Sequence, residues 1–217
     1  MKVYRLPKEC TALIFDLDST LYTDECYAQS QIDLPIEKLA RMQGKTFGRM
    51  SEEISAFRKK WSDEHGGQSV SLANVFLSFG ISISESVRWR EELCVPEKYL
   101  AADPQLRSAL EQLASRFTLS VVSNNPASVA ARTLRTLGVE DLFRAVIGLD
   151  TFGVSKPHEE PFMRAAALCT AAPESCISVG DRYDIDIALP LELGMGGILV
   201  DGVKDVYILP DLLAKGG

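Results

Sequence analysis

TALIFDLD, at residues 11–18, is the stretch that decides the fold, because it is an uninterrupted apolar run that ends in two carboxylates, Asp16 and Asp18. Such a run predicts a strand buried on both faces, as in a parallel sheet. In open α/β folds the ligand lies outside the carboxyl ends of the strands. The same segment therefore predicts a parallel sheet and places two acidic side chains at its ligand-binding edge.

From residue 103 onward, short apolar runs alternate with helical patterns. The predicted strands are 117–123, 145–148, 176–180 and 197–200. The helices predicted between them are 126–137, 159–169 and 185–193. Strands that alternate with helices of this length predict βαβ units, in which parallel strands are joined by right-handed crossovers. We therefore expect an α/β protein with a Rossmann-like parallel sheet core.

Residues 23–102 have a different composition, rich in Glu, Gln, Arg, Lys and Ser with spaced apolar positions such as Ile54 and Trp61. This near-helical periodicity predicts three to five helices, with breaks at Gly66-Gly67 and Gly80. The segment is far longer than a helical crossover between neighbouring strands. We therefore expect an inserted all-helical domain at 23–102, above the ligand edge of an α/β core formed by 1–22 and 103–217.

The charge balance and the cysteine pattern exclude several classes of protein. Lysine and arginine total 23 against 30 acidic residues, a net charge of −7, and no basic run is present, so a nucleic acid polymer is a poor partner. No segment approaches the ~18–20 apolar residues of a membrane span, and MKVYRLPKEC at the start lacks the apolar stretch of a signal peptide. Five cysteines without a C-x-x-C pair, and two distant histidines, argue against disulfides and zinc. We expect a cytoplasmic monomer or homodimer that does not bind membranes.

Polar residues follow each of the predicted strands at the edge where ligands bind. They comprise carboxylates, a hydroxyl, an amide and an ammonium, on four connections distant in sequence: Asp16, Asp18, Ser123, Asn124, Lys156, Asp181 and Asp186. Because parallel strands end at the same edge of a sheet, we expect these side chains to meet there.

The negative charges of carboxylates that lie this close together must be neutralised. Two like charges about 4 Å apart repel by several kcal/mol at an effective dielectric near 20, so either pKa values rise or a divalent cation lies among them. Oxygen ligands without His or Cys select a hard ion, and Mg²⁺ suits a few carboxylates with remaining water positions. With Lys156, the Ser123 hydroxyl, and helix N-termini near Asn125 and Arg182, the site favours a phosphate group.

The spacing of Asp16 and Asp18 separates two chemical roles. Side chains at i and i+2 of an extended segment point to the same side. One carboxylate can therefore attack phosphorus, giving an aspartyl-phosphate, while the other manages the proton of the leaving or entering oxygen. A bound cation lowers the repulsion between the anionic nucleophile and the anionic substrate.

Four motifs resemble those of the haloacid dehalogenase-like superfamily of hydrolases. FDLDSTL at 15–21 resembles its D-x-D-x-T signature, and the others, in order, are VVSNN at 121–125, SKP at 155–157 and VGDRYDID at 179–186. GMGGILV and the closing LPDLL are similar to the family's last strand and tail. The order and rough spacing agree over the whole core, and the helical insertion is similar to the C1 cap of that superfamily.

The resemblance implies a catalytic role for several of these residues. Asp16 would be the nucleophile and Asp18 the general acid and then the general base. Ser123 and the backbone of Asn124 would hold phosphoryl oxygens, and Lys156 would orient the nucleophile and the phosphate.

The resemblance also implies a Mg²⁺ site. Its ligands would be Asp16, the backbone carbonyl of Asp18, and Asp181. Asp186 would be a supporting carboxylate, and Thr20 matches the last position of the first motif. Family members that cleave carbon–halogen bonds lack an acid at the position of Asp18, so its presence favours phosphoryl transfer.

We therefore expect a Mg²⁺-dependent phosphatase acting on a small phosphorylated metabolite: a nucleotide 5′-monophosphate, a sugar phosphate or phosphoglycolate. A phosphomutase of the same superfamily is the first alternative. A signalling module that is phosphorylated on Asp without turnover is the second, although such modules are smaller and lack a cap.

Overall fold

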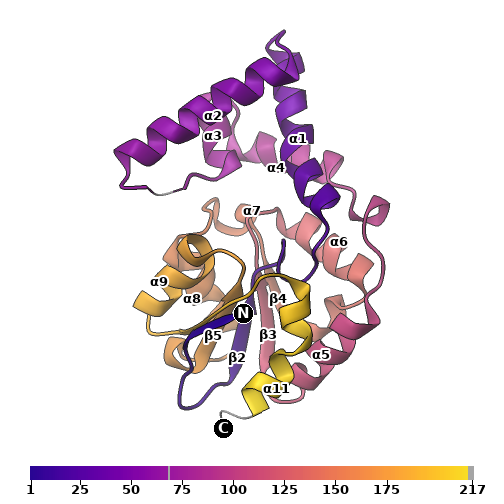
Figure 1. The fold of residues 1–217 in the computed structure, drawn as a ribbon, viewed down its shortest axis with the longest axis vertical. Coiled ribbons are helices and arrows are strands. Elements are labelled where there is room, and N and C mark those ends of the chain that lie inside the picture. Colours follow the sequence, from indigo (N-terminus) through magenta and orange to yellow (C-terminus); the bar gives the residue numbers. More distant parts are fainter. Residues whose placement is uncertain (68, 215–217) are drawn as a thin grey trace. The chain divides into compact units, whose positions relative to one another are not determined.

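The structure, a computed structural model, describes residues 1–67 and 69–214. The chain forms two compact units (Figure 1). One comprises Met1–Asp24 together with the chain from Pro96 onward, and the other comprises Glu25–Val95. Each unit is described by itself below.

The larger unit is built on a six-stranded sheet in the order β1-β6-β5-β2-β3-β4 (Figure 1). Its strands are β1 (Lys2–Arg5), β2 (Ala12–Phe15), β3 (Thr118–Val122), β4 (Phe143–Ile147), β5 (Cys176–Gly180) and β6 (Gly196–Leu199). All neighbouring pairs are parallel except β1 and β6, which are antiparallel. The predicted α/β fold with a Rossmann-like parallel sheet is confirmed.

Strand β2 lies in the middle of the sheet, between β5 and β3, and its four residues are all buried. Its last residue, Phe15, is in register with Val121 of β3 and Val179 of β5. The backbone N–H of Asp16 continues this pairing by donating to the carbonyl of Val179 at 2.8 Å. The three strands therefore end at the same level, which brings the residues after them together.

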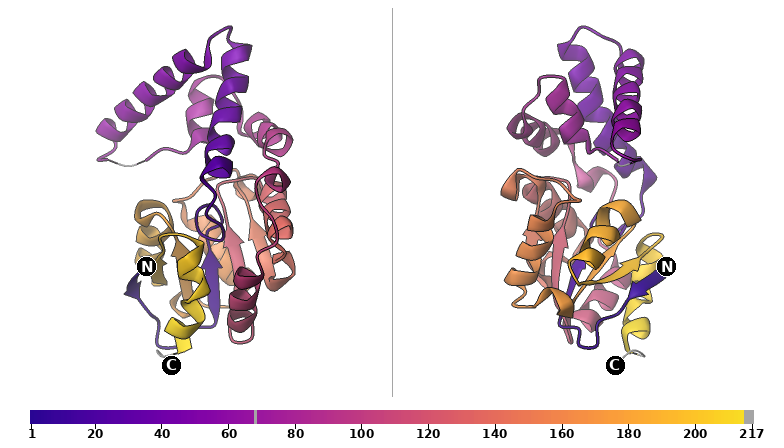
Figure 2. Two further views of the ribbon diagram at one scale, coloured as in Figure 1. Left: turned by 45° about the vertical axis from the view of Figure 1, so that its right-hand side comes forward. Right: turned by 90° about the vertical axis from the view of Figure 1, so that its left-hand side faces the viewer.

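Helices pack on both faces of the sheet (Figure 2). They are α5 (Pro104–Ala114), α6 (Ala127–Leu137), α7 (Leu149–Phe152), α8 (Glu159–Leu168), α9 (Ala188–Glu192), α10 (Val203–Tyr207) and α11 (Leu209–Ala214). On one face Ile14 and Val122 of the sheet form a buried cluster with Phe162 and Ala165 of α8. Fully burying side chains of the size of Ile14, Val122 and Phe162 contributes about 1.5–3 kcal/mol each.

The structure differs from the sequence-based prediction at several elements. Helices α5, α7 and α10 were not predicted, and β4 begins two residues before the predicted strand 145–148. Strand β1 was not predicted, because KVYR is a short, largely exposed edge strand without an apolar run. The predicted helix 185–193 begins earlier, as a single π-helical turn over Tyr183–Ile187 that leads into α9. The helix predicted at 126–137 begins one residue later, with Pro126 as its N-cap.

The smaller unit consists of helices with a core of their own. They are α1 (Glu25–Met42), α2 (Phe47–Glu64), α3 (Leu72–Ser78) and α4 (Ile83–Leu93). The hydroxyls of Thr46, Ser71 and Ser82 cap α2, α3 and α4 by accepting from the backbone N–H three residues on. Leu39 and Trp89 are among the buried side chains of the core. Among the described residues, no helix combines the length and the apolar character that crossing a bilayer requires.

Candidate active site

The predicted site residues gather at the carboxyl edge of the sheet. Asp16, Ser123 and Asp181 each stand directly after a strand, namely β2, β3 and β5. Lys156 belongs to the loop between α7 and α8. Because β2 and its two neighbours end in register, residues that are more than 160 positions apart in the sequence meet at one place.

A buried ion-pair group lies at the centre of this edge. The Lys156 ammonium is 2.6 Å from Oδ1 of Asp16 and 2.7 Å from Oδ1 of Asp186. Burial raises the pKa of Asp16, and the negative charges of Asp186 and Asp18 raise it further, while Lys156 opposes them. Burial lowers the pKa of Lys156, but the two carboxylates outweigh this effect and raise it overall. The lysine is therefore held as a cation between two buried acids.

Three carboxylates lie close enough to share a cation. Asp16, Asp181 and Asp186 each offer one oxygen, and these oxygens lie within 4.8 Å of one another. Burial and the charge of Asp186 both raise the pKa of Asp181. One ammonium cannot neutralise three acids, and an all-oxygen donor set is the kind that Mg²⁺ prefers. The residues present therefore fit Mg²⁺.

Asp186 is the most constrained of the three acids. Its Oδ1 accepts from Lys156, its Oδ2 accepts from the backbone N–H of Arg182 at 3.1 Å, and its carbonyl accepts from the Ser178 hydroxyl at 2.7 Å. A Cβ on Gly180 would lie 2.4 Å from the Cβ of Asp186, so only glycine leaves room for this side chain.

Asp18 lies outside this group of three. Its Oδ1 accepts from the Tyr22 hydroxyl, and its Oδ2 accepts from Nδ2 of Asn125 at 2.8 Å and from Oγ of Ser123 at 3.4 Å. The chain turns immediately afterwards, with Ser19 at a φ of 60°. The structure therefore places Asp18 at the same edge as Asp16 but gives it separate hydrogen-bond partners.

Ser123, Asn124 and Thr20 surround these acids. Ser123 is buried, and its Oγ accepts from the backbone N–H of Asn125 at 3.0 Å. Asn124 holds the Lys156 backbone from both sides, donating to its carbonyl at 3.2 Å and accepting from its N–H at 2.7 Å. Thr20 is fully buried, with its Oγ1 3.5 Å from Oδ2 of Asp16.

Sequence reasoning did not assign Asn125 and Tyr22 to the site. Two adjacent asparagines follow β3, and nothing in the pattern NN shows which side chain turns toward which acid. Tyr22 stands four residues after Asp18, a spacing that carries a contact only where the chain turns, as it does here.

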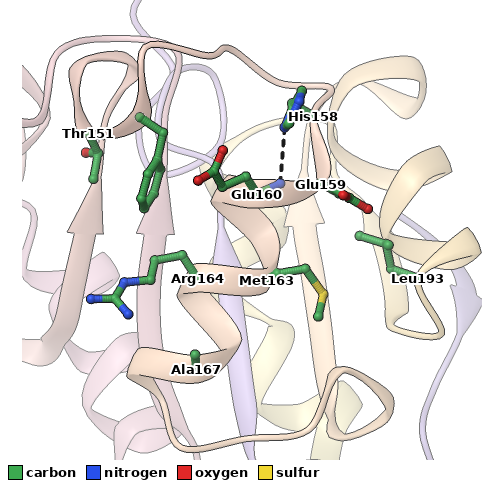
Figure 3. Close-up of a pocket in the computed structure, with 9 residues that line it drawn as sticks. Thr151, His158, Glu159, Glu160, Met163, Arg164, Ala167 and Leu193 are labelled. Atoms are coloured by element: carbon green, nitrogen blue, oxygen red, sulfur yellow. Dashed lines mark hydrogen bonds between the residues drawn. The ribbon is translucent and has the colours of Figure 1, made fainter.

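A groove of about 760 Å³ lies elsewhere in the same unit, beside α7, α8 and α9. Figure 3 shows Met163 and Leu193 among its lining, and His158 accepting from the backbone N–H of Glu160 at 3.2 Å. None of the predicted site residues lines this groove. The buried acids, rather than this groove, define the candidate active site.

Comparison with known proteins assigns a family to this architecture. A family model described as haloacid dehalogenase-like hydrolase matches residues 10–194. A phosphoglycolate phosphatase of Colwellia psychrerythraea is 33% identical over 93 residues, which span 43% of this chain and 40% of that protein. The chain thus spans less than half the length of the first curated relatives that it matches, including the phosphoglycolate phosphatase of Aquifex aeolicus at 43%. A glyceraldehyde 3-phosphate phosphatase of Methanothermobacter thermautotrophicus is 26% identical over 88% of this chain and 85% of its own length.

Solved structures share the fold. A HAD phosphatase from Thermococcus onnurineus gives a TM-score of 0.66 at 22% identity, covering 94% of this chain and 97% of its own. A β-phosphoglucomutase from Clostridium difficile gives 0.55 at 17% identity, covering 94% and 99%. At these identities the likeness concerns the fold alone.

Proposed function

Since this chain belongs to the haloacid dehalogenase-like hydrolases, we propose that it hydrolyses the phosphate monoester of a small metabolite. The observation that carries this proposal is the position of Asp16. It directly follows the central strand, forms an ion pair with the buried Lys156, and lies close to the carboxylates of Asp181 and Asp186. Asp18 lies two residues further along the chain and has hydrogen-bond partners of its own.

In the first step an oxygen of Asp16 attacks phosphorus, and the bond from phosphorus to the leaving oxygen breaks. Asp18 gives its proton to that oxygen, so an alcohol departs and an aspartyl-phosphate remains on Asp16. Lys156 keeps the nucleophile oriented through its 2.6 Å bond to Oδ1. The Ser123 hydroxyl and the backbone N–H of Asn124 hold phosphoryl oxygens.

In the second step the Asp18 carboxylate takes a proton from a water molecule, whose oxygen attacks phosphorus. The bond between phosphorus and Asp16 breaks, inorganic phosphate leaves, and both acids return to their starting states. Asp16, Asp181 and the backbone carbonyl of Asp18 would hold Mg²⁺, which when bound would supply positive charge that reduces repulsion between the nucleophile and the phosphate dianion. Asp186, whose two oxygens are already bonded, supports this arrangement.

The site and the relatives both support a small phosphate monoester as the substrate. The matched relatives named above are phosphatases of phosphoglycolate and glyceraldehyde 3-phosphate, both small monoesters. For this chain we propose a nucleotide 5′-monophosphate, a sugar phosphate or phosphoglycolate. We further propose that the helical unit Glu25–Val95 acts as a cap that selects the part of the substrate beyond the phosphate.

The test is phosphate release from p-nitrophenyl phosphate and from a panel of metabolite monoesters, with Mg²⁺ and with EDTA. We expect release that requires Mg²⁺ and is lost in Asp16→Asn. Asp211→Asn, which changes an exposed acid on α11, is the matched control and should retain full activity. Activity that persists in Asp16→Asn contradicts the proposal. Phosphate transfer to a second hydroxyl of the substrate would identify a mutase, and a phosphorylated protein that persists without phosphate release would identify a signalling module.

A further inference from the structure

We propose that Asn125 and Tyr22 are positioning residues that hold the Asp18 carboxylate where it exchanges protons with the leaving group and the water. This inference rests on the proposed function. It adds two residues that act through Asp18 rather than on the substrate.

The two residues anchor opposite oxygens of the same carboxylate. The Tyr22 hydroxyl donates to Oδ1, and Nδ2 of Asn125 donates to Oδ2 at 2.8 Å. Both anchors are buried, at 3% and 4% exposed, whereas Asp18 itself is only partly buried. A carboxylate gripped at both oxygens by buried donors cannot rotate freely about its side-chain bonds.

The backbone of Asn125 is itself fixed. Its N–H donates to Oγ of Ser123 at 3.0 Å, and its carbonyl accepts from the N–H of Leu149 at 3.0 Å. Its neighbour Asn124 turns the other way, to the backbone of Lys156. The adjacent asparagines therefore serve different partners: one secures the loop that carries the lysine, and the other secures the second acid.

These anchors also keep Asp18 apart from the buried acids. The Lys156 ammonium is shared by Asp16 and Asp186, and Asp18 is not one of the three carboxylates that converge. A hydroxyl can donate or accept, whereas an amide nitrogen only donates. Oδ2 of Asp18 therefore faces an obligate donor in Asn125, whereas Oδ1 faces a hydroxyl that can take either role.

The test measures how strongly each variant depends on the leaving group. Aryl and alkyl phosphate monoesters, from p-nitrophenyl phosphate to phosphoglycolate, differ in their need for a proton as the ester bond breaks. We use kcat/KM, which excludes the later hydrolysis of the aspartyl-phosphate. General acid catalysis contributes ~10²–10⁴-fold. We expect Asn125→Ala and Tyr22→Phe to lose about 10-fold or more on the alkyl ester but under about 3-fold on the p-nitrophenyl ester.

Two further variants separate positioning from a general structural role. In an Asp18→Asn background, adding Asn125→Ala should cause no further loss on the alkyl ester, because residues that act as a unit are not additive. Asn125→Asp keeps the shape but places an acceptor against Oδ2, so it should be worse than Asn125→Ala. Inhibition by inorganic phosphate should be unchanged in Asn125→Ala and Tyr22→Phe, which do not alter the charge of the site. Tyr99→Phe, at an exposed position outside the helical unit, is the matched control and should behave like the unmodified protein.

Two outcomes overturn the inference alone. One is an equal loss on all esters in folded Asn125→Ala and Tyr22→Phe proteins, and the other is a further loss on adding Asn125→Ala to Asp18→Asn. The proposed function fails separately, if the unmodified protein releases phosphate from no monoester or if Asp18→Asn shows no dependence on the leaving group. Tyr22→Phe removes a single oxygen atom, so it keeps the test decisive should Asn125→Ala fail to fold.

Discussion

The Lys156 ammonium is bonded to two buried carboxylates, Asp16 and Asp186, and is itself 3% exposed. Removing one partner from a buried ion pair leaves uncompensated charge, which costs about 3–5 kcal/mol. We expect Lys156→Met to lower the free energy of unfolding by an amount in that range, measured in urea, and to abolish turnover. The matched control is Lys98→Met at an exposed position, which should change stability by no more than about 0.5 kcal/mol. A loss below about 1 kcal/mol in Lys156→Met would show that the site does not depend on this cation.

Gly180 gives a second test at the residue scale. An added Cβ would lie 2.4 Å from the Cβ of Asp186, so that side chain must move. We expect Gly180→Ala to cost about 1–3 kcal/mol of stability, as overpacking does, and to reduce turnover because Asp186 is displaced from Lys156. Gly48, in α2, has nothing within 4 Å of the same added atom. Gly48→Ala should therefore be neutral or stabilising by up to about 1 kcal/mol. Equal urea midpoints for the two alanine variants would contradict this prediction.

At the residue scale, the sequence predicts where a side chain lies in the fold better than it predicts the direction in which that side chain points. Asp16, Ser123 and Asp181 could be predicted because each directly follows an apolar strand run, and parallel strands end at one edge. The side chain of Asp18 could not be placed in the same way. Strand β2 ends at Phe15, so the direction of Asp18 comes from its hydrogen bonds, among them the one from Asn125, and not from the pleat of a strand.

Helices α5 and α10 are joined by one carboxylate, that of Asp103. Its Oδ1 caps α5 by accepting from the N–H groups of Gln105 and Leu106, and its Oδ2 accepts from the Tyr207 hydroxyl at 2.6 Å. Burial, together with this hydrogen bond, raises the pKa of Tyr207 to about 12. The neutral phenol is therefore favoured by folding.

This link predicts a pH-dependent stability difference between the protein and Tyr207→Phe. An acid whose pKa is raised on folding contributes stability below its unfolded pKa, near 10 for tyrosine, and loses it as the pH rises toward the folded value. We expect Tyr207→Phe to be less stable by about 1 kcal/mol at pH 7, with the difference shrinking above about pH 10. Urea unfolding at several pH values measures it, with exposed Tyr99→Phe as the control. A difference that stays constant to pH 11 would contradict the assignment.

At the element scale, the strands and helices that were predicted for the α/β unit could be read from the sequence because apolar runs alternate there with helical periodicity. β1 has no such signal, since an exposed edge strand needs few apolar residues. The π-helical turn over Tyr183–Ile187 also has no sequence signature. The turn carries Asp186, which accepts from the Ser178 hydroxyl of β5 and from the backbone N–H of Arg182, and π-turns of this kind are frequent at functional sites.

The whole molecule consists of two units with separate cores, and its two tryptophans both belong to Glu25–Val95. Tryptophan fluorescence therefore reports on the helical unit. Leu39 is fully buried in that unit and Ile14 is 1% exposed in the sheet. We expect Leu39→Ala, at a cost of about 2–5 kcal/mol, to shift the fluorescence transition, while Ile14→Ala shifts only the loss of activity. Coincident shifts in both variants would show that the two units unfold as one.

At this scale the sequence predicts the insertion of a helical segment and the chemistry of the core, but not the residues that would recognise a substrate. The change of composition after the first strand predicts an inserted helical segment, and the four motifs predict the chemistry of the core. The cap role proposed for Glu25–Val95 implies contacts with a substrate, and no readable pattern in the sequence marks the residues that would make them. Recognition by a cap depends on shape and on a few side chains, which leave no fixed spacing in the chain.

The position of β2 in the sheet has a consequence for folding during synthesis on the ribosome. This strand is made early, but its partners β3 and β5 follow only after the whole helical unit. At about 5–20 residues per second, roughly 8–30 s pass between the synthesis of Phe15 and that of Cys176. Until Thr118 is made, neither partner of β2 exists, and the edge that pairs with β5 has no partner until Cys176 is made. The helical unit has every residue of its core by Val95. The residues of the helical unit are therefore complete before β2 has any partner, and the strand that precedes Asp16 gains its second partner only late in synthesis.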